Sequence, residues 1–417
     1  MLKTITIENY LSYQKEQTLD LVPLSLKDLP DNVHTCDDFD PSLQLLKSVG
    51  IYGYNNYGKT NFIKTYQSFI RSIVSNDIEA DHFRSNGCET PTKATRFETE
   101  FILGNTKYRY GYEVLECEVQ SEYLTYAEPK IRENYLFERR KQSIAVSKTW
   151  QKLCDKRLDL AVCCTRPNQL LLSLLMTQDG FPHIDEVAKW LRGNIIIPDD
   201  YERRHDDRAM MIIFHKDYQD LLYDFLEKAD LGLKIVLDKL KCPDCRDLCA
   251  NTDLLSFWKE KKRMKIEACP KHKELEDFSR IDRWKYESAG AYRYLMLSCY
   301  LAFAIKNKQL IFVDELESKL HVFLLRYLIK TFHDATIDKP GSQLIFTTHN
   351  TSLMSRHLFR RDQFILVEKD SSGASSLRRI HSPKSPIRAE ASLEKEYMGG
   401  KVGGISQELK EAVSHMC

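Results

Sequence analysis

The chain has 417 residues, of which 42% are hydrophobic and 29% are charged. This length predicts two to three domains with a core that needs no disulfide staples. Lysine and arginine total 61 against 60 aspartates and glutamates, which argues against a protein that binds polyanions through an overall basic surface, although a local basic groove stays compatible.

Composition also predicts the compartment. The longest uncharged apolar run, residues 294–305, is shorter than the ~20 residues that a membrane span needs. The first residues lack the apolar stretch of a signal peptide. Twelve cysteines without an export signal indicate a reducing compartment, with thiols or a metal site in place of disulfides. We therefore expect a cytoplasmic protein with no membrane partner.

The predicted elements form three parts in chain order. Apolar alternation predicts strands over 2–7 and 19–22, a buried strand over 48–52, and a meander over 95–103 and 108–115. The middle part of the chain is richer in charged residues, and helical periodicity predicts a helix over 217–233. The last third alternates helices (294–307, 323–332) with strands (309–313, 342–346, 363–367), which is typical of a parallel sheet with crossovers.

These elements predict an α/β fold divided at two points. We expect an N-terminal lobe over 1–126, an inserted and mainly helical domain over 127–280, and a C-terminal lobe over 281–417. The glycine-rich tail after Glu394 is expected to be a poorly packed extension.

A phosphate-binding loop follows the buried strand at 48–52. Residues 53–60 (GYNNYGKT) fit the pattern G-x-x-x-x-G-K-[ST]. Gly53 and Gly58 let the backbone curl so that N–H groups point at phosphate oxygens. Lys59 would reach the terminal phosphates, and the Thr60 hydroxyl would bind Mg²⁺. The alternative, a chance match in a glycine–asparagine turn, is disfavoured by the strand before the loop and the helical stretch after it.

Two acids end the strand at 309–313. Asp314 would complete the Mg²⁺ shell, and Glu315 would orient or deprotonate an attacking water. Strands often end in acids, so this pattern is specific only together with the phosphate loop.

The order of the motifs resembles a known group. The loop, the Ser288-Ala-Gly290 turn, Asp314-Glu315 and then His349 are similar to the ATP-binding-cassette (ABC-type) heads of RecF/SMC-like ATPases. The resemblance implies ATP and Mg²⁺ as cofactors, a mixed sheet with a parallel P-loop core, and a head-to-head dimer. In that group the Ser-x-Gly turn of one protomer contacts the γ-phosphate held by the other, and the histidine senses the same phosphate.

The resemblance also assigns residues around the loop. Asn55, Asn56 and Asn61 would join the phosphate loop in binding ATP, while Lys59, Glu315 and His349 would be catalytic. Taken without the other motifs, Ser288 is better explained as a helix cap.

A narrower resemblance concerns the RloA-like branch of AAA/ABC-type ATPases. The motifs NYLSY at 9–13, GKTN at 58–61, YESAG at 286–290 and FTTHN at 346–350 follow it, so the match covers most of the first hundred and the last hundred and forty residues. Members of this branch, related in architecture to AriA and PtuA, occur in bacterial anti-phage modules beside a separate effector, often a TOPRIM or HNH nuclease. The resemblance therefore implies such a partner.

Three departures from this pattern bear on turnover. Tyr54 and Tyr57 stand where small residues or proline are usual, and Ala291 stands in place of threonine. Bulky tyrosines could stack on the base or the partner protomer, or they could slow hydrolysis. A protein that holds ATP as a structural ligand, without hydrolysing it, is therefore one alternative function.

A cysteine cluster lies in the middle part. Cys242 and Cys245, with Cys269 and His272, form C-x-x-C and C-x-x-H pairs that match the ligand spacing of a structural Zn²⁺ site. Free thiols in a charged helical region are the alternative.

Local basic runs raise one more alternative. Residues 259–265 carry five lysines and arginines, and 139–141 form a smaller cluster. A solvated surface is the usual explanation, and a nucleic-acid contact is the functional one. A RecF-like DNA-binding repair ATPase is thus the second alternative function.

Overall fold

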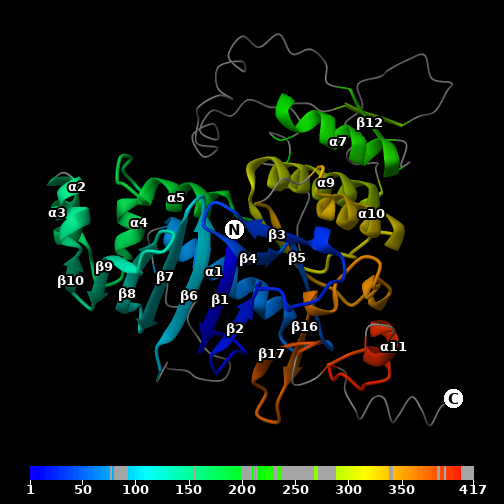
Figure 1. The fold of residues 1–417 in the computed structure, drawn as a ribbon, viewed down its shortest axis with the longest axis horizontal. Coiled ribbons are helices and arrows are strands. Elements are labelled where there is room, and N and C mark those ends of the chain that lie inside the picture. The colour runs from blue at the N-terminus through cyan, green and yellow to red at the C-terminus, as the bar shows by residue number, and fades with distance from the viewer. Residues whose placement is uncertain are drawn as a thin grey trace.

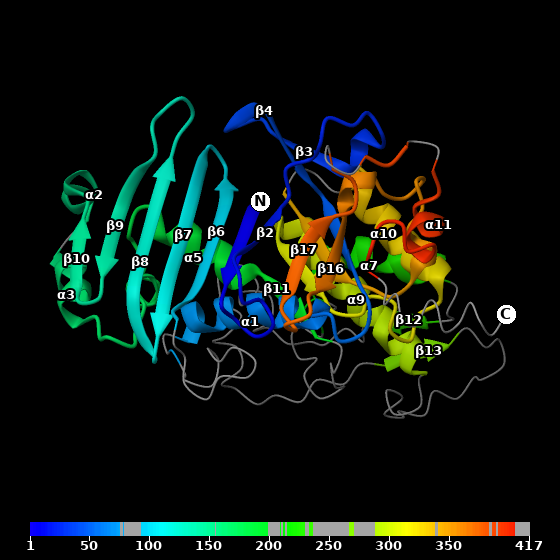
Figure 2. The same cartoon turned by 90° about the horizontal axis from the view of Figure 1, so that it is seen from below.

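The computed structural model describes residues 1–75, 78, 93–154, 156–198, 209, 212, 215–229, 233–236, 267–270, 288–337, 341–382, 386–388 and 391–404. Two large sheets organise this part of the chain (Figures 1 and 2). One has seven antiparallel strands, and the other has six strands that are parallel except at one edge.

The antiparallel sheet has the order β10-β9-β8-β7-β6-β1-β2. Its strands are β1 (Leu2–Glu8), β2 (Gln17–Asp20), β6 (Thr95–Leu103), β7 (Thr106–Leu115), β8 (Glu118–Ala127), β9 (Asn134–Arg140) and β10 (Ser143–Val146). The predicted meander is confirmed, since Leu103 pairs with Thr106 around the expected turn. The sheet runs past residue 126 through β9 and β10, so this edge consists of residues from the stretch predicted as an insertion.

The parallel sheet has the order β11-β14-β15-β5-β16-β17. Its strands are β5 (Ser48–Tyr52), β11 (Ile195–Ile197), β14 (Leu310–Val313), β15 (Gln343–Thr347), β16 (Phe364–Lys369) and the antiparallel edge strand β17 (Ser375–Arg379). The expected α/β class with a parallel P-loop core is therefore confirmed. Every residue of β5, β14 and β15 is buried, as expected for strands covered on both faces.

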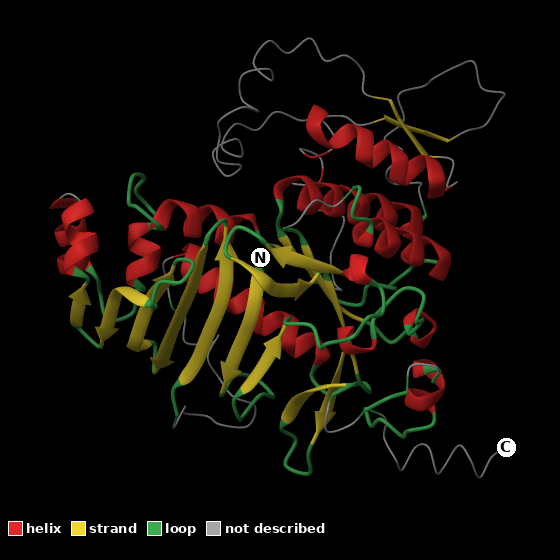
Figure 3. Ribbon diagram, viewed as in Figure 1, coloured by secondary structure: helices red, strands yellow, loops and turns green. Residues whose placement is uncertain are grey.

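Helices cover the sheets (Figure 3). They are α1 (Lys59–Ser75), α2 (Lys148–Leu153), α3 (Lys156–Cys164), α4 (Leu171–Leu175), α5 (Ile184–Gly193), α7 (Lys216–Ala229), α9 (Ala289–Asn307), α10 (Val322–His333) and α11 (Leu393–Met398). Two short strand pairs, β3 (Val33–Cys36) with β4 (Asp40–Leu46) and β12 (Leu233–Val236) with β13 (Glu267–Pro270), complete the described strands. Among the described residues, no helix is long and apolar enough to span a bilayer.

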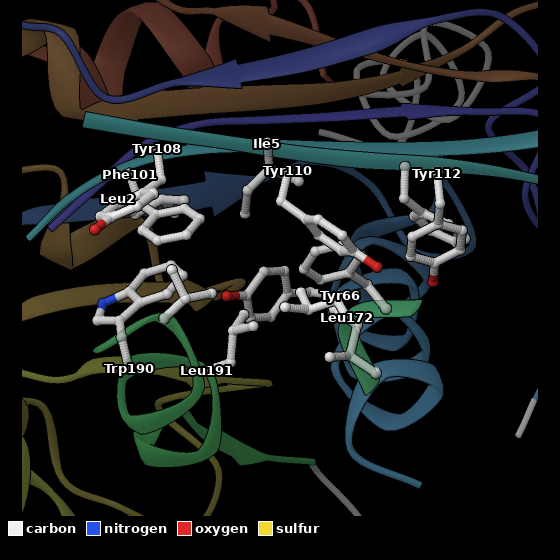
Figure 4. Packing of buried hydrophobic residues seen from close by; sticks show 14 of the residues in the cluster. Leu2, Ile5, Tyr66, Phe101, Tyr108, Tyr110, Tyr112, Leu172, Trp190 and Leu191 are labelled. Atoms are coloured by element: carbon white, nitrogen blue, oxygen red, sulfur yellow. The ribbon is translucent and has the colours of Figure 1, made fainter. Parts of the chain in front are cut away.

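Helix α1 lies between the two sheets and shares a core with both. On one side its Tyr66 ring stacks on Phe312 of β14, with centroids 4.2 Å apart. On the other, Phe69 stacks on Tyr112 of β7. Figure 4 shows the aromatic side chains of the antiparallel sheet pointing at α1, α4 and α5. This shared core holds the helix that follows the phosphate loop in a fixed place.

The C-terminal tail was predicted to be poorly packed, but its described part is packed. Residues 393–404 are packed, because Leu393 and Tyr397 are buried and the Tyr397 ring lies 6.0 Å from that of Tyr52 at the end of β5. Glycines at 399, 400, 403 and 404 shape turns there instead of marking a loose extension. Residues 405–417 lie outside the described part of the chain.

A buried ion pair fastens β8 and β9 to the segment before α4. Glu122 and Arg139 are both fully buried. The Glu122 carboxylate accepts from the Tyr110 hydroxyl and from the backbone N–H groups of Leu171 and Leu172. Arg139 donates to three backbone carbonyls. Burial raises the pKa of Glu122, and these donors oppose the effect, so the carboxylate depends on its partners.

We expect Arg139→Ala to lower the free energy of unfolding by about 3–5 kcal/mol, because it leaves the Glu122 charge buried without its cation. Arg140→Ala, next in sequence but exposed, is the matched control and should change stability by no more than about 0.5 kcal/mol. Urea unfolding of both variants provides the measurement. Equal losses in the two variants would contradict the role of the pair.

Candidate nucleotide-binding site

Strand register brings the predicted site residues to one edge of the parallel sheet. Val313 of β14 pairs with Phe346 of β15, and Thr347 of β15 pairs with Ile51 of β5. The three strands therefore end together, and their carboxyl ends place Asp314, Thr347 and the loop 53–58 side by side. The edge where parallel strands end beside a strand–loop–helix turn is a general place for ligand sites.

The phosphate loop has the backbone that its glycines predict. Gly58 has a φ of +113°, and a Cβ there would lie 2.4 Å from the Ser375 hydroxyl and 2.8 Å from that of Ser12. At Gly53, a Cβ would lie 2.6 Å from the Val367 carbonyl. Only glycine fits at either position, because the loop is pressed against neighbouring backbone and side chains.

Residues from both ends of the chain brace this loop. The Ser375 hydroxyl donates to the Tyr57 carbonyl at 2.6 Å and lies within hydrogen-bond distance of the Ser12 hydroxyl at 2.8 Å. The Tyr13 hydroxyl donates to the Gly58 carbonyl at 2.9 Å. The loop is thus held in place by the segment after β1 and by β17, which are more than 350 residues apart.

Lys59 is buried at the start of α1. Its ammonium donates to the carbonyls of Gly53 at 2.9 Å and Tyr54 at 3.2 Å. An ammonium has three N–H donors, so one is left for a phosphate oxygen. Burial lowers the pKa of Lys59 to about 8, while three nearby carboxylates oppose the shift. Those carboxylates are Glu315, Asp314 and Glu317.

A hydroxyl–carboxylate cluster lies beside Lys59. The Thr60 hydroxyl donates to Asp314 Oδ1 at 3.3 Å, and the Thr347 hydroxyl donates to the same oxygen at 2.5 Å. Mg²⁺ binds oxygen ligands at ~2.0–2.1 Å in an octahedron, so adjacent ligand oxygens lie about 3 Å apart. The pair formed by Thr60 and Asp314 fits such an ion in both chemistry and spacing.

Glu315 follows in a backbone conformation that is costly for a residue with a side chain. Its φ is +45°, and its N–H donates to the Thr347 hydroxyl at 2.8 Å. Non-glycine residues in this region cost of order 1–3 kcal/mol and persist only where the surroundings enforce them, often at functional sites. The side chain is half-buried and its charge faces Lys59.

His349 lies two residues beyond β15 and faces the same cluster. Burial and the positive charge of Lys59 lower the pKa of His349, against the opposing charges of Glu317 and Asp314. The lowered pKa favours the neutral ring, which has one N–H to donate. Its backbone N–H donates to Glu317 Oε1 at 2.5 Å.

Ser288 and Gly290 lie at the start of α9. Ser288 is the N-cap, and its hydroxyl accepts from the Ala291 N–H at 3.1 Å. A Cβ at Gly290 would lie 2.6 Å from the Lys319 carbonyl, so this turn packs on the loop that follows the two acids. In the described part of the chain, no hydrogen bond joins Ser288 or Gly290 to the phosphate loop of the same molecule.

The asparagines of the motif differ in their surroundings. Asn55 and Asn56 are exposed at the tip of the loop, and Asn56 has a φ of +62°. Asn61, in contrast, donates to the Ser12 hydroxyl at 2.8 Å and so helps to fix the loop. The rings of Tyr54 and Tyr57 contact each other edge to face, with centroids 5.6 Å apart.

The predicted zinc ligands are not placed by the structure. Cys242, Cys245 and His272 lie outside the described residues, and Cys269 is described only by its backbone in β13. Within the described residues no cluster of three or more histidine, cysteine or acidic side chains could hold a metal ion. The zinc site stays a prediction.

Four supporting residues were missed from the sequence. Thr347 aligns both acids, Glu317 contacts His349, and Ser12 and Ser375 brace the loop. Thr347 lies within the FTTHN motif at 346–350, Ser12 lies within NYLSY at 9–13, and Glu317 follows the two acids closely, so their positions in the sequence were a usable signal. No sequence pattern joins Ser12 to Ser375.

One family model is similar to part of the chain. The family model described as "AAA domain, putative AbiEii toxin, Type IV TA system" matches residues 183–355. That stretch contains Ser288, Asp314, Glu315 and His349, while the phosphate loop precedes it. No curated protein matches the chain by sequence.

Two solved structures are similar to most of the chain. The "SMC head domain from Thermotoga maritima" is 12% identical, with 91% of this chain and 99% of that one covered and a TM-score of 0.45. The structure "SmcHead bound to the C-winged helix domain of ScpA" is 14% identical, with 90% and 97% covered and a TM-score of 0.47. The chain thus has a phosphate loop in its first part and, over residues 183–355, a stretch that is similar to an AAA domain.

Proposed function

We propose that this protein binds ATP·Mg²⁺ and hydrolyses the γ-phosphate as an ABC-type ATPase. The observation that carries the proposal is the cluster of Lys59, Thr60 and Asp314, in which a cation and a fitting pair of metal ligands lie at one strand edge. Bound Mg²⁺ would neutralise phosphate charge. Glu315, on its enforced backbone, would orient or deprotonate the water, and neutral His349 would donate to the γ-phosphate.

A second copy of the chain would complete the site. The exposed Ser288 and the half-buried Gly290 lie at the start of a 19-residue helix, and a helix N-terminus favours anions. In the described residues this turn makes no hydrogen bond to its own phosphate loop, which agrees with a role toward a partner's nucleotide. The dimer, like the RloA-like resemblance, stays part of the proposal.

Nucleotide state would control a separate effector in bacterial anti-phage defence. The family description names a toxin system, and the resemblance of the motifs implies a TOPRIM or HNH nuclease as the partner. Both support a regulatory ATPase. Co-purification with the product of the neighbouring gene, followed by mass measurement of the complex, would identify the effector.

Glu315→Gln should bind ATP, lower the single-turnover rate by about 10²-fold or more because general-base assistance is lost, and accumulate as an ATP-bound dimer. Rapid-quench assays and light scattering measure these properties. Glu396→Gln, at an acid on α11 far from the cluster in sequence, is the control and should behave as wild type. Hydrolysis by Glu315→Gln at the wild-type rate would refute the assignment. If the wild-type protein binds ATP but does not hydrolyse it, the alternative function holds, in which ATP is a structural ligand of a non-hydrolysing scaffold.

ATP affinity should fall as the pH rises above about 8. The pKa of Lys59 is lowered to about 8 by burial, so above that pH the free site loses the cation that attracts phosphate. Binding must then take up a proton, and affinity should drop by up to about tenfold per pH unit. Calorimetry from pH 7 to 9.5 tests this, and Lys59→Met should show weak binding without the same slope. A flat profile in the wild type would contradict it.

A nucleic-acid contact is the second candidate function, and one observation favours it. Residues 128–166 carry ten lysines and arginines against five acids, although the whole chain is nearly neutral. This stretch includes β9, β10, α2 and α3, which lie together at one end of the antiparallel sheet (Figure 2). Among the described residues, the exposed side chains of Lys148, Lys152 and Lys156 form no ion pair. Such a surface suits a phosphate backbone.

Lys148→Glu/Lys152→Glu should weaken binding of duplex DNA and reduce the salt slope of log K by about 2, close to the ~0.9 expected per lost phosphate contact. Fluorescence anisotropy at several salt concentrations measures both quantities. Lys306→Glu/Lys330→Glu changes the net charge equally at exposed sites on α9 and α10 and serves as the control. Similar losses in both variants would mean that net charge, and not this surface, governs binding.

A further inference from the structure

We propose that Glu317 is a positioning residue, which holds the backbone of His349 so that its ring faces the γ-phosphate. The proposal rests on the ATPase function proposed above and adds a residue that the motif roles leave unassigned. Its basis is a hydrogen bond between two strand exits that are 32 residues apart: His349 N–H donates to Glu317 Oε1 at 2.5 Å.

In the turn after β15, the Glu317 carboxylate is the acceptor for the His349 N–H. Thr348 N–H donates to the Ile51 carbonyl at 3.1 Å, and Asn350 N–H donates to the Thr348 hydroxyl at 3.0 Å. His349 lies between them, just past the last strand residue, where the sheet ladder no longer provides a carbonyl. His349 is exposed, and within the described residues its N–H takes its partner from a side chain, the Glu317 carboxylate. A carboxylate makes a shorter and stronger bond to N–H than a neutral acceptor does.

The loop that carries Glu317 is fixed to the same strand end. Leu316 N–H donates to the Thr347 carbonyl at 3.0 Å, and Glu315 N–H donates to the Thr347 hydroxyl at 2.8 Å. Leu316 is itself buried. The loop that carries Glu317 is therefore hydrogen-bonded to Thr347, the last residue of β15. The Glu317 side chain then contacts His349, two residues after the end of β15. Hydrogen bonds thus join the loop after β14 to the turn after β15.

The surroundings of Glu317 separate its role from that of Glu315. One carboxylate oxygen is used by His349, and the other is buried without a hydrogen-bond partner in the described residues. Its charge faces Lys59 and His349. Glu315 is joined to β15 through its N–H, which donates to the Thr347 hydroxyl. Glu317 acts through His349, and Glu315 would act on water.

The test compares Glu317→Ala, Glu317→Gln, His349→Ala and the double variant Glu317→Ala/His349→Ala. We expect Glu317→Ala to slow single turnover by about 10- to 100-fold, the usual cost of displacing an oriented group, and to reduce the preference for ATP over ADP. Glu317→Gln keeps an amide oxygen that can accept from His349 and should restore the rate to within about threefold of wild type. Circular dichroism and thermal unfolding check that each variant is folded.

The double variant decides whether Glu317 works through His349. If it does, Glu317→Ala adds nothing once His349 is alanine, because the two changes are then fully coupled. An equal loss in both backgrounds would overturn the proposal, and so would a Glu317→Gln variant as slow as Glu317→Ala.

Hydrogen exchange of the His349 amide separates this proposal from the ATPase function. Glu317→Ala should speed exchange at this amide by about tenfold or more, with no nucleotide present, because the bond that protects it is lost. Unchanged exchange would overturn the positioning role even if ATP is hydrolysed. Faster exchange in a protein that binds no ATP would refute the ATPase function and leave the bond itself established.

Discussion

The site depends on one constraint, the common register of three parallel strands. Because Thr347 follows Phe346, and Phe346 pairs with Val313, the Thr347 hydroxyl lies against both acids at the end of β14. It donates to Asp314 and accepts from the Glu315 N–H. A slip of one residue in this pairing would turn the side chains to the opposite face of the sheet. The chemistry of the acids is therefore set by a neighbouring strand as much as by their own.

A second dependence joins the two ends of the chain. The phosphate loop contacts Ser12 and Tyr13 on one side and Ser375 on the other. A glycine at 58 lets these side chains approach, and the loop in turn bridges the antiparallel sheet and the edge of the parallel sheet. A change in the loop would therefore act directly on both sheets.

Charge is distributed unevenly in this nearly neutral protein. Three carboxylates act on the buried ammonium of Lys59 at the strand edge, where Arg293 donates to the Asp314 carbonyl, and the pair formed by Thr60 and Asp314 suits a divalent cation that arrives with a polyanionic ligand. At the far end of the antiparallel sheet the exposed charge is mainly basic. The near balance of 61 basic and 60 acidic residues thus includes an acid-containing cluster at the site and a mainly basic surface at the far end of the antiparallel sheet.

The sequence by itself determined the fold class and which residues make up the motifs. Local signals are enough for this, since a buried strand, a glycine-bearing loop and a helix are adjacent in sequence, and so are Asp314 and Glu315. Only the tertiary structure decided which distant residues support them. Ser12 with Ser375, Thr347 with Asp314, and Glu317 with His349 meet through strand order and register, which no short pattern encodes. The tail shows the same limit: its glycines predicted looseness, but Tyr397 packs on Tyr52 because the end of β5 leaves an apolar surface to cover.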